Sequence, residues 1–353
     1  MDSGPIVSFR LPLRLASRFA VLPLLLLGSC VGAGNANSDE PKAVADTPVC
    51  DGQTFGDLER SETVSDGCKA ELSAYLPASS DNSTGRLAML GNEARGDGSL
   101  RVFLAGLDAA GAPLSAAAYV GAHVSVRGDA GKFVESGAVL RATGFGALGE
   151  GALSLEFVND YSASMNLADL RVVERIQHDL VAALPPIYEG EVTLFSDEVR
   201  VKQAFTTDRN ALLAGVQRDE HFERKLTALY DGMGNGLDSL TARSRPARVL
   251  MVATDGFENA SVAYKKSDIV KGIADDGIFV IMLGALFAKE SELASLAGPR
   301  GVYFYTPLYA DLDDRLNAWM GALAHGAALD IPAGTAQKRP LRLEVAGETV
   351  EID

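Results

Sequence analysis

LSLEFVNDYSASM, residues Leu153–Met165, is the stretch that decides the fold of this chain. Apolar residues alternate from Leu153 to Phe157 as in a β-strand, and the pattern then breaks into a polar turn. The turn carries one carboxylate and two hydroxyls, on Asp160, Ser162 and Ser164. Hard cations such as Mg2+ prefer oxygen donors of this kind, so the turn indicates part of a metal site. Alternatively, the aspartate is a turn residue and one of the serines caps the next helix.

Apolar strands and amphipathic helices alternate after this stretch. Strands are expected at residues 192–195, 199–205, 249–253, 278–283 and 302–305, and helices at 172–184, 208–216, 229–240, 267–274, 289–297 and 310–323. This rhythm predicts an α/β fold with a doubly wound, mostly parallel sheet covered on both faces. Ligands of such sheets bind at the carboxyl ends of the strands, where Asp160 and Asp255 would both lie.

Residues 49–149 form short alternating runs separated by turns, which predict a smaller amino-terminal β-sandwich domain of immunoglobulin-like character. Strands are expected at residues 100–104, 120–126 and 133–140. Gly144–Gly149 matches the G-x-G-x-x-G pattern, but an extended run follows it instead of a helix, so a domain linker is favoured over a phosphate loop. Residues 150–328 then form the α/β domain. Residues 329–353 include a β-hairpin, which we expect to return and pair with the amino-terminal β domain.

The first 29 residues have the features of an export signal. A leader with three arginines precedes the apolar run Phe19–Leu27, which is too short to span a bilayer as a helix. The run ends in Leu-Gly-Ser-Cys30, which resembles a bacterial lipoprotein signal whose cysteine is lipidated after cleavage. Val31 follows, which favours the outer membrane, and residues 30–48 would be a flexible tether. The alternative is an ordinary signal peptide with an incidental cysteine.

Two further cysteines, Cys50 and Cys68, would lie in an oxidising compartment if the chain is exported. A disulfide between them would contribute about 3 kcal/mol on the chain-entropy model. Two free thiols are the alternative. No zinc-type cysteine and histidine spacing occurs in the sequence.

The formal net charge of the chain is −15. A chain this acidic, with no polybasic segment, does not bind nucleic acid by neutralising phosphates. The sequence therefore excludes nucleic acid as the expected partner.

Five positions in order, Asp160, Ser162, Ser164, Thr227 and Asp255, closely resemble the metal-ion-dependent adhesion site of von Willebrand factor type A (VWA) domains. That site is written D-x-S-x-S, then a Thr, then an Asp after a strand. The resemblance covers about residues 150–325. The chain departs from many members just before Thr227, where it has Lys-Leu and they have Gly-Gly.

The resemblance implies a role for each of these five residues. The two serine hydroxyls would bind Mg2+, or Mn2+ or Ca2+, directly, and Thr227 would bind it directly or through water. Asp160 and Asp255 would hold coordinated waters or complete the shell. An Asp or Glu of a protein partner would then take the open position on the ion. This implies a membrane-anchored envelope protein that binds a partner through a divalent cation.

Two other functions stay open at this point. One is a scaffold or assembly factor in the cell envelope that needs no metal, and its contacts would survive EDTA. The other is an envelope hydrolase, but no G-x-S-x-G, H-E-x-x-H or complete phosphate-loop motif supports one. We therefore expect no enzymatic activity and no catalytic residue.

Overall fold

The computed structural model describes residues 48–50, 53–54, 78–83, 86–128, 131–149, 151–165, 167–219, 221–222, 225–255, 258–285, 288–306 and 312–352. The leader, the tether, Cys30 and Cys68, and with them the lipidation and disulfide predictions, lie outside these residues. Strands β1 (Pro48–Cys50) and β2 (Gln53–Thr54) pair with each other in a separate small unit. The remaining elements belong to a second unit, described below.

Five parallel strands form the centre of this unit, in the spatial order β10-β9-β12-β13-β14. They are β9 (Leu153–Asp160), β10 (Tyr188–Phe195), β12 (Ala247–Thr254), β13 (Phe279–Ala285) and β14 (Val302–Thr306). Every residue of β9, β10 and β13 is buried, as expected for strands covered on both faces. The predicted strands are confirmed. Four of them extend one to four residues beyond the expected bounds, and β13 begins one residue later and ends two residues later than expected.

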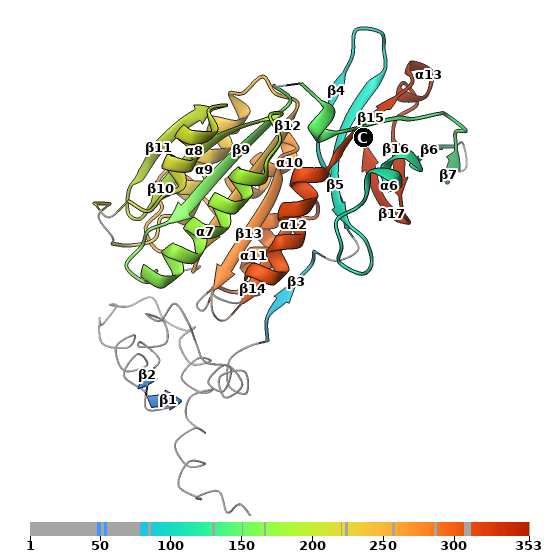
Figure 1. Cartoon of the computed structure of the whole chain (residues 1–353). Coiled ribbons are helices and arrows are strands. Elements are labelled where there is room, and N and C mark those ends of the chain that lie inside the picture. The colour runs from blue at the N-terminus through green and yellow to red at the C-terminus, as the bar shows by residue number, and fades with distance from the viewer. Residues whose placement is uncertain are drawn as a thin grey trace, which may run out of the picture. The chain divides into compact units, whose positions relative to one another are not determined.

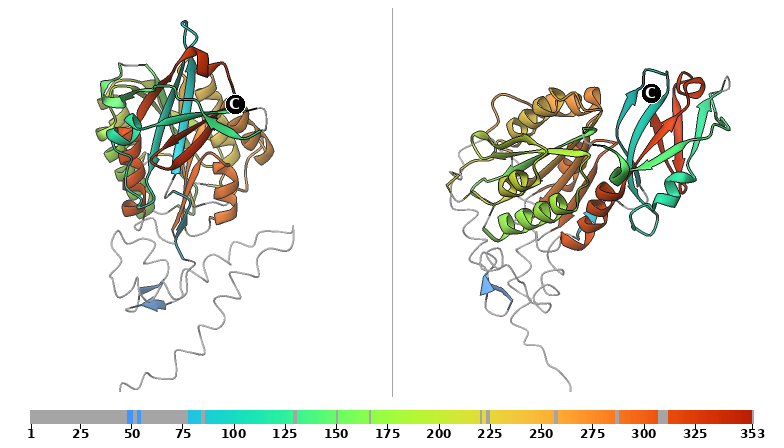
Figure 2. Two further views of the ribbon diagram at one scale, coloured as in Figure 1. Left: turned by 90° about the vertical axis from the view of Figure 1, so that its right-hand side faces the viewer. Right: turned by 45° about the horizontal axis from the view of Figure 1, so that its top comes forward.

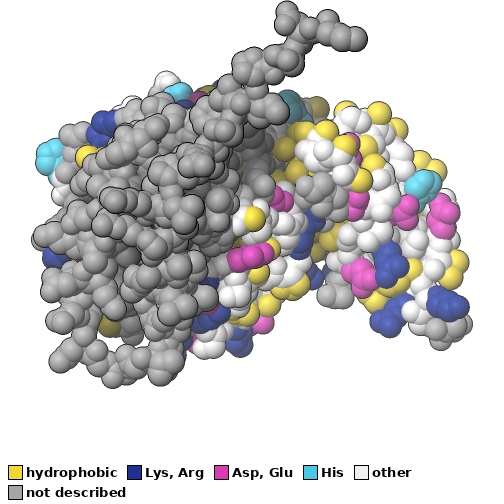
Figure 3. Space-filling view, turned by 90° about the horizontal axis from the view of Figure 1, so that it is seen from below, with side chains coloured by type: hydrophobic (Ala, Val, Ile, Leu, Met, Phe, Trp, Pro, Cys, Tyr) yellow, Lys and Arg dark blue, Asp and Glu magenta, His cyan; other side chains and the backbone are white. Residues whose placement is uncertain are grey.

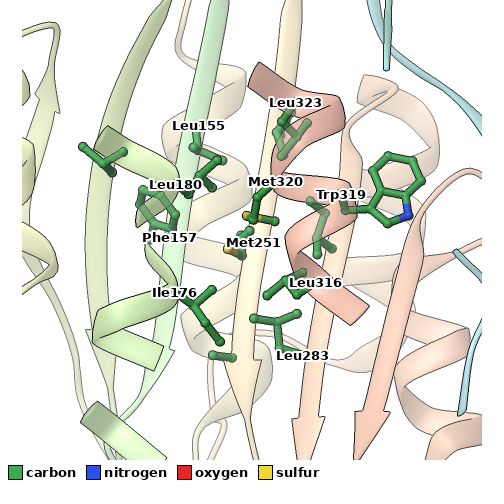
Figure 4. Close-up of a cluster of buried hydrophobic side chains, with 14 of the residues drawn as sticks. Leu155, Phe157, Ile176, Leu180, Met251, Leu283, Leu316, Trp319, Met320 and Leu323 are labelled. Carbon is green, nitrogen blue, oxygen red and sulfur yellow. The ribbon is translucent and has the colours of Figure 1, made fainter. Parts of the chain in front are cut away.

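Helices cover both faces of these strands (Figures 1 and 2). One face carries α7 (Leu167–Ala183), α8 (Arg209–Val216) and α12 (Asp313–His325), and the other carries α9 (Leu229–Thr241), α10 (Lys266–Asp276) and α11 (Glu290–Ala297). Figure 4 shows the apolar cluster between α7, α12 and the sheet, including Leu155, Phe157 and Trp319. All six helices were predicted.

The sheet is mixed rather than mostly parallel, and it has 11 strands. β11 (Val199–Thr206) pairs antiparallel with β10 at one edge, and the two-residue β3 (Ser80–Asp81) pairs with β14. On another side, β12 meets β4 (Arg86–Ala94), and the order continues through β5 (Leu100–Leu107), β15 (Ala327–Ile331) and β8 (Arg141–Gly144). β12 pairs with β4 at one point, where Ala247 lies opposite Gly91. A Cβ on Gly91 would lie 2.0 Å from the Pro246 carbonyl oxygen, so this contact requires glycine.

A separate antiparallel sheet has the order β17-β16-β6-β7. It contains β6 (His123–Arg127), β7 (Phe133–Glu135), β16 (Leu341–Val345) and β17 (Glu348–Ile352). The carboxyl-terminal hairpin thus pairs with an amino-terminal strand, with Leu343 opposite Val124. A second apolar core lies between this sheet and the β4-β5-β15 strands.

The predicted amino-terminal β-sandwich therefore needs correction. Both layers draw strands from the two ends of the chain, and one layer is part of the large mixed sheet. The strand expected at 120–126 begins later, because residues Ala116–Val120 form the short helix α6, capped by the Ser115 hydroxyl. The strand expected at 133–140 stops at Glu135, and Gly137 with a φ of 65° follows it. The remaining elements are a short 3-10 helix, Phe145–Ala147, and α13 (Ala333–Ala336).

No helix of the described residues is long and apolar enough to cross a membrane. Figure 3 shows one face of the molecule, on which basic and acidic side chains lie among apolar ones wherever the described residues are visible.

Trp319 is the largest side chain of the core and gives a direct test of this packing. It is fully buried, it stacks on Phe279 at 5.5 Å between ring centroids, and its indole N–H donates to the Ser83 carbonyl at 3.2 Å. Trp319→Ala should lower the free energy of unfolding by about 3–5 kcal/mol, because it leaves a cavity and an unpaired carbonyl. Val139→Ala, at a side chain that is 87% exposed, should change it by less than about 0.5 kcal/mol. Urea unfolding followed by circular dichroism measures both, and equal effects would contradict the packing.

Candidate metal centre

Three loops carry the five predicted metal residues, and hydrogen bonds join these loops. The first loop begins at Asp160, where β9 ends; the second precedes α9 and contains Thr227; the third begins at Asp255, directly after β12. The Ala163 N–H donates to the Lys225 carbonyl at 2.8 Å, which joins the first loop to the second. The Asn259 N–H donates to the Thr227 carbonyl at 3.0 Å, which joins the third loop to the second. The carboxyl ends of β9 and β12 thus meet the start of α9.

Asp160 is fully buried, and both of its carboxylate oxygens accept hydrogen bonds. Oδ1 accepts the Ser162 N–H at 2.7 Å, and Oδ2 accepts the Thr254 hydroxyl at 2.7 Å. Burial raises the pKa of the Asp160 carboxyl, and the hydrogen bonds from Ser162 and Thr254 oppose that rise. The carboxylate therefore shapes the turn and ties it to β12.

The two hydroxyls of the D-x-S-x-S turn lie together. The Oγ atoms of Ser162 and Ser164 are 3.0 Å apart; Ser162 is fully buried and Ser164 is exposed. Two oxygen atoms at this separation can contact one cation, with one donor inside the protein and the other at its surface.

Thr227 is 2% exposed, and its backbone is fixed on both sides. Its N–H donates to the Asn259 side-chain oxygen at 2.9 Å, and its carbonyl accepts the Asn259 and Ala260 N–H groups. The next residue, Ala228, donates its N–H to the Ser196 carbonyl at 2.6 Å and is the N-cap of α9. The position of Thr227 therefore depends on where α9 begins.

Asp255 is 3% exposed and follows Thr254, whose hydroxyl contacts Asp160. All five predicted residues are thus on the loops at this end of the sheet, and their donor atoms are hydroxyl and carboxylate oxygens. No group of three or more His, Cys, Asp or Glu able to hold a metal occurs among the residues that the structure describes. The donor set therefore fits a hard cation bound largely through hydroxyls.

Several residues that support the site were not predicted. Thr254 and Asn259 hold Asp160 and Thr227, as described above. Glu258 accepts the Tyr230 N–H at 3.0 Å near the start of α9, and this places a carboxylate where the helix dipole favours one. The Tyr161 hydroxyl accepts the Asp219 N–H at 3.2 Å, which holds the second loop against the first. In the sequence, Asp255-Gly-Phe and the following Glu and Asn indicate a polar loop. They do not indicate which backbone N–H groups the Glu and Asn side chains would bind.

The chain was compared with known proteins. Residues 155–317 match the von Willebrand factor type A domain, and no curated protein matches the chain. The solved structures that resemble it include proximal thread matrix protein 1 from the mussel byssus with a zinc-occupied MIDAS motif, at 17% identity and a TM-score of 0.45. This match covers 54% of the present chain and 50% of the mussel chain, so it spans half of that protein.

Two bacterial structures also resemble the chain, and each match covers 48% of this chain and 99% of the other. One is the conserved hypothetical protein BatB from Bacteroides thetaiotaomicron, at 17% identity and a TM-score of 0.40. The other is an aerotolerance-related membrane protein from Bacteroides fragilis, at 16% identity and a TM-score of 0.41. These similarities are distant. The match to the domain family covers the strands and loops described above, so residues 155–317 of this chain are a VWA domain.

Proposed function

We propose that this protein binds a protein partner through a divalent cation held by the D-x-S-x-S loop. The observation that carries the proposal is the geometry of that loop. Asp160 is fixed by two hydrogen bonds of 2.7 Å. Beside it, the hydroxyl of the buried Ser162 lies 3.0 Å from the hydroxyl of the exposed Ser164.

The Ser162 and Ser164 hydroxyls would bind the ion directly, and Thr227 would bind it directly or through a water. The two carboxylates, Asp160 and Asp255, would hold coordinated waters, because each Asp160 oxygen already accepts a hydrogen bond from the protein. With few direct anionic ligands, a bound Mg2+, Mn2+ or Ca2+ would stay electrophilic and would attract a carboxylate from the partner. We therefore propose an Asp or Glu side chain as the contact that the partner offers.

Apolar side chains on the same three loops support a protein as the partner. Leu167 follows the first loop, Leu226 precedes Thr227, and Val262 lies on the third loop, and they are 53%, 54% and 93% exposed. Exposed apolar residues near a polar centre are typical of protein interaction sites. A protein partner can bury these three side chains, whereas a small inorganic or sugar ligand would not contact all of them.

Binding is favoured over hydrolysis by the placement of the histidines. His123, His178, His221 and His325 are all exposed, and His221 shows 96% of its side chain to solvent. A general base needs a fixed position beside the metal, which an exposed side chain does not have. We propose that the protein is not an enzyme. A metal-independent scaffold is the alternative, and its partner contacts would survive EDTA.

We also propose that the chain is exported and anchored in the bacterial envelope through a lipid on Cys30. The support is the leader itself, with its arginines, its short apolar run and the Leu-Gly-Ser-Cys30 motif. Incorporation of a radiolabelled fatty acid that Cys30→Ser abolishes would establish the anchor, and equal labelling of both chains would contradict it.

Metal binding should raise the thermal stability of the full-length chain. A ligand present at 100 times its dissociation constant and bound only by the folded state adds about 2.7 kcal/mol to the free energy of unfolding. Mg2+, Mn2+ or Ca2+ should therefore raise the midpoint of thermal unfolding of the parent chain. Ser164→Ala should keep the metal-free midpoint, because Ser164 is exposed, and should lose most of the metal-induced rise.

Ser267→Ala is the matched control, since Ser267 is an exposed serine of α10 in the same domain. It should keep the full rise. A parent chain that shows no rise with any of these ions at millimolar concentration would contradict the metal site, and the scaffold function would then be favoured.

Thr254 should contribute to metal affinity without contacting the ion. Thr254→Val keeps the shape of the side chain but removes the hydroxyl that donates to Oδ2 of the buried Asp160 carboxylate. We expect the free energy of unfolding to fall by about 1–3 kcal/mol and the metal-induced rise to shrink. Thr349→Val, at an exposed position of β17, should change neither quantity. A Thr254→Val chain as stable as the parent would show that this hydrogen bond does not hold the turn.

A further inference from the structure

The polar residues under α9 form a group that the proposed metal site does not use. On the face of the sheet that α9 covers, β9 carries Ser154 and Glu156, and β10 carries Glu189, Glu191 and Thr193. All five are buried, and Glu156 and Thr193 are fully buried. Two carboxyl groups face each other here, because Glu156 lies opposite Glu191 in the parallel pairing of β9 with β10. Carboxylates on neighbouring strands repel each other strongly when water is excluded.

Glu189 has cations and donors for its full charge. Its carboxylate receives two hydrogen bonds from Arg243, both 2.8 Å long, one from the Ser154 hydroxyl at 2.6 Å, and an ion pair with Arg245 at 3.0 Å. These contacts outweigh the effect of burial and lower the pKa of Glu189. This carboxylate is therefore ionised.

Glu191 has partial compensation. Its Oε2 accepts the Phe205 N–H at 3.2 Å. The hydrogen bond with Glu189 raises the pKa of Arg243 most, and the charge of Glu191 adds to this rise. Its Oε1 is buried and has no hydrogen-bond partner within the described part of the chain. One oxygen is therefore left to face Glu156.

Glu156 has no compensation for a negative charge. Neither of its carboxyl oxygens has a hydrogen-bond partner among the described residues, and the nearby Thr193 hydroxyl has none either. Arg248, opposite Ser154 on β12, donates one terminal N–H to the Arg243 carbonyl, and its buried Nε has no hydrogen-bond partner among the described residues, so it forms no hydrogen bond with Glu156. The residue opposite Glu156 on β12 is Leu250. Burial, and then the charge of Glu191, raise the pKa of Glu156 well above its ordinary value. The Thr193 hydroxyl opposes this rise through its proximity, although it forms no hydrogen bond of normal geometry with Glu156.

Helix α9 rests directly on this group. A Cβ on Gly236 would lie 3.1 Å from Cγ of Glu156 and 2.9 Å from a methyl carbon of Val158, so the helix backbone has no space to move closer. The two carboxylates of α9, Asp231 and Asp238, do not bind Glu156. Asp231 accepts three backbone N–H groups of residues 262–264, and Asp238 accepts the Tyr264 hydroxyl. Asp160, further along β9, has its own donors. Nothing on the helix therefore balances a charge on Glu156.

We propose that Glu156 and Glu191 form a carboxylic acid–carboxylate pair in which Glu156 keeps its proton at neutral pH and donates a hydrogen bond to the Glu191 carboxylate. The pair supports the middle of α9, at Gly236, and Glu156 is thus a positioning residue for the helix that begins after Thr227. Loss of the proton at alkaline pH would place a second negative charge under the helix. Water or a rearrangement of α9 would then have to compensate that charge. The pair itself does not require the metal site to exist.

Glu156→Gln tests the proton, because glutamine has the shape of the protonated acid and cannot ionise. In the unfolded chain Glu156 ionises above its ordinary pKa, whereas in the folded chain it stays protonated. Folding of the parent therefore takes up a proton in this range, and its folding constant should fall relative to Glu156→Gln by up to about tenfold per pH unit. Denaturant unfolding of both full-length chains between pH 5 and pH 9 measures the ratio.

Glu189→Gln is the matched control, since it lies on the same face two residues from Glu191. It removes a carboxylate that must be charged, so it should lower the free energy of unfolding at every pH between 5 and 9. Its difference from the parent should not grow as the pH rises. Ser164→Ala, which affects the proposed metal site alone, should follow the parent at every pH. This result separates failure of the acid pair from failure of the metal site.

Infrared spectroscopy gives a second measurement that does not depend on stability. The folded parent should show the C=O band of a protonated carboxylic acid at pH 7, and Glu156→Gln should lack it. The proposal would be overturned if the ratio of the folding constants of the parent and Glu156→Gln does not change with pH and the parent shows no acid band. A midpoint raised by Na+, Mg2+ or Ca2+ in the parent and in Ser164→Ala, but not in Glu156→Gln, would also overturn it, because a cation and not a proton would then balance the pair.

Discussion

The hydrogen bonds of the buried Asp160 carboxylate are the interaction on which the candidate site depends. Asp160 ends β9, receives the N–H of Ser162 two residues later, and receives the hydroxyl of Thr254 from the end of β12. A buried carboxylate without such donors would destabilise the fold by several kcal/mol. The same two bonds bend the chain so that both serine hydroxyls lie together, and they hold the first and third loops in register. Stability and site geometry thus have one cause.

The two faces of the central sheet have different chemistry. The face toward α7 and α12 is apolar, and its Phe157 packs in one cluster with Trp319 of α12. The face toward α9 contains a row of polar and acidic side chains on β9 and β10. Helix α9 approaches this row closely through a glycine, because a Cβ on Gly236 would lie 3.1 Å from Cγ of Glu156. Because Thr227 directly precedes α9, the packing of this helix sets the position of one proposed metal ligand. The polar face therefore links the interior of the sheet to the loops at its edge.

Much of the α/β unit could be predicted from the sequence, because its elements are long and periodic. The strand predicted at 278–283 and the helix predicted at 310–323, which contains Leu316 and Trp319, are examples. The five metal residues are all on the expected loops, although their role as ligands stays a prediction.

The long-range pairings were beyond sequence analysis. β15, with the sequence AALDI, has little alternation, and its neighbours β5 and β8 lie more than 180 residues earlier. The junction of β12 with β4 depends on one glycine, which in the sequence is an ordinary Gly within a strand pattern. The hydrogen-bond partners Thr254 of Asp160 and Asn259 of Thr227 are 94 and 32 positions away in the sequence, and neither periodicity nor motif spacing predicts such contacts. The acid pair was missed for the same reason, because only the register of β9 with β10 brings Glu156 to Glu191.

A crystal structure of the protein grown with Mn2+ tests directly whether the D-x-S-x-S loop holds a divalent cation. The anomalous signal of the ion locates it without reference to any expected site. We predict a peak in direct contact with the Ser162 and Ser164 hydroxyl oxygens, at about 2.1–2.2 Å as for hard-cation sites with near-octahedral geometry. A peak elsewhere, such as between Glu156 and Glu191, or ordered density for both serines with no peak beside them, would contradict it.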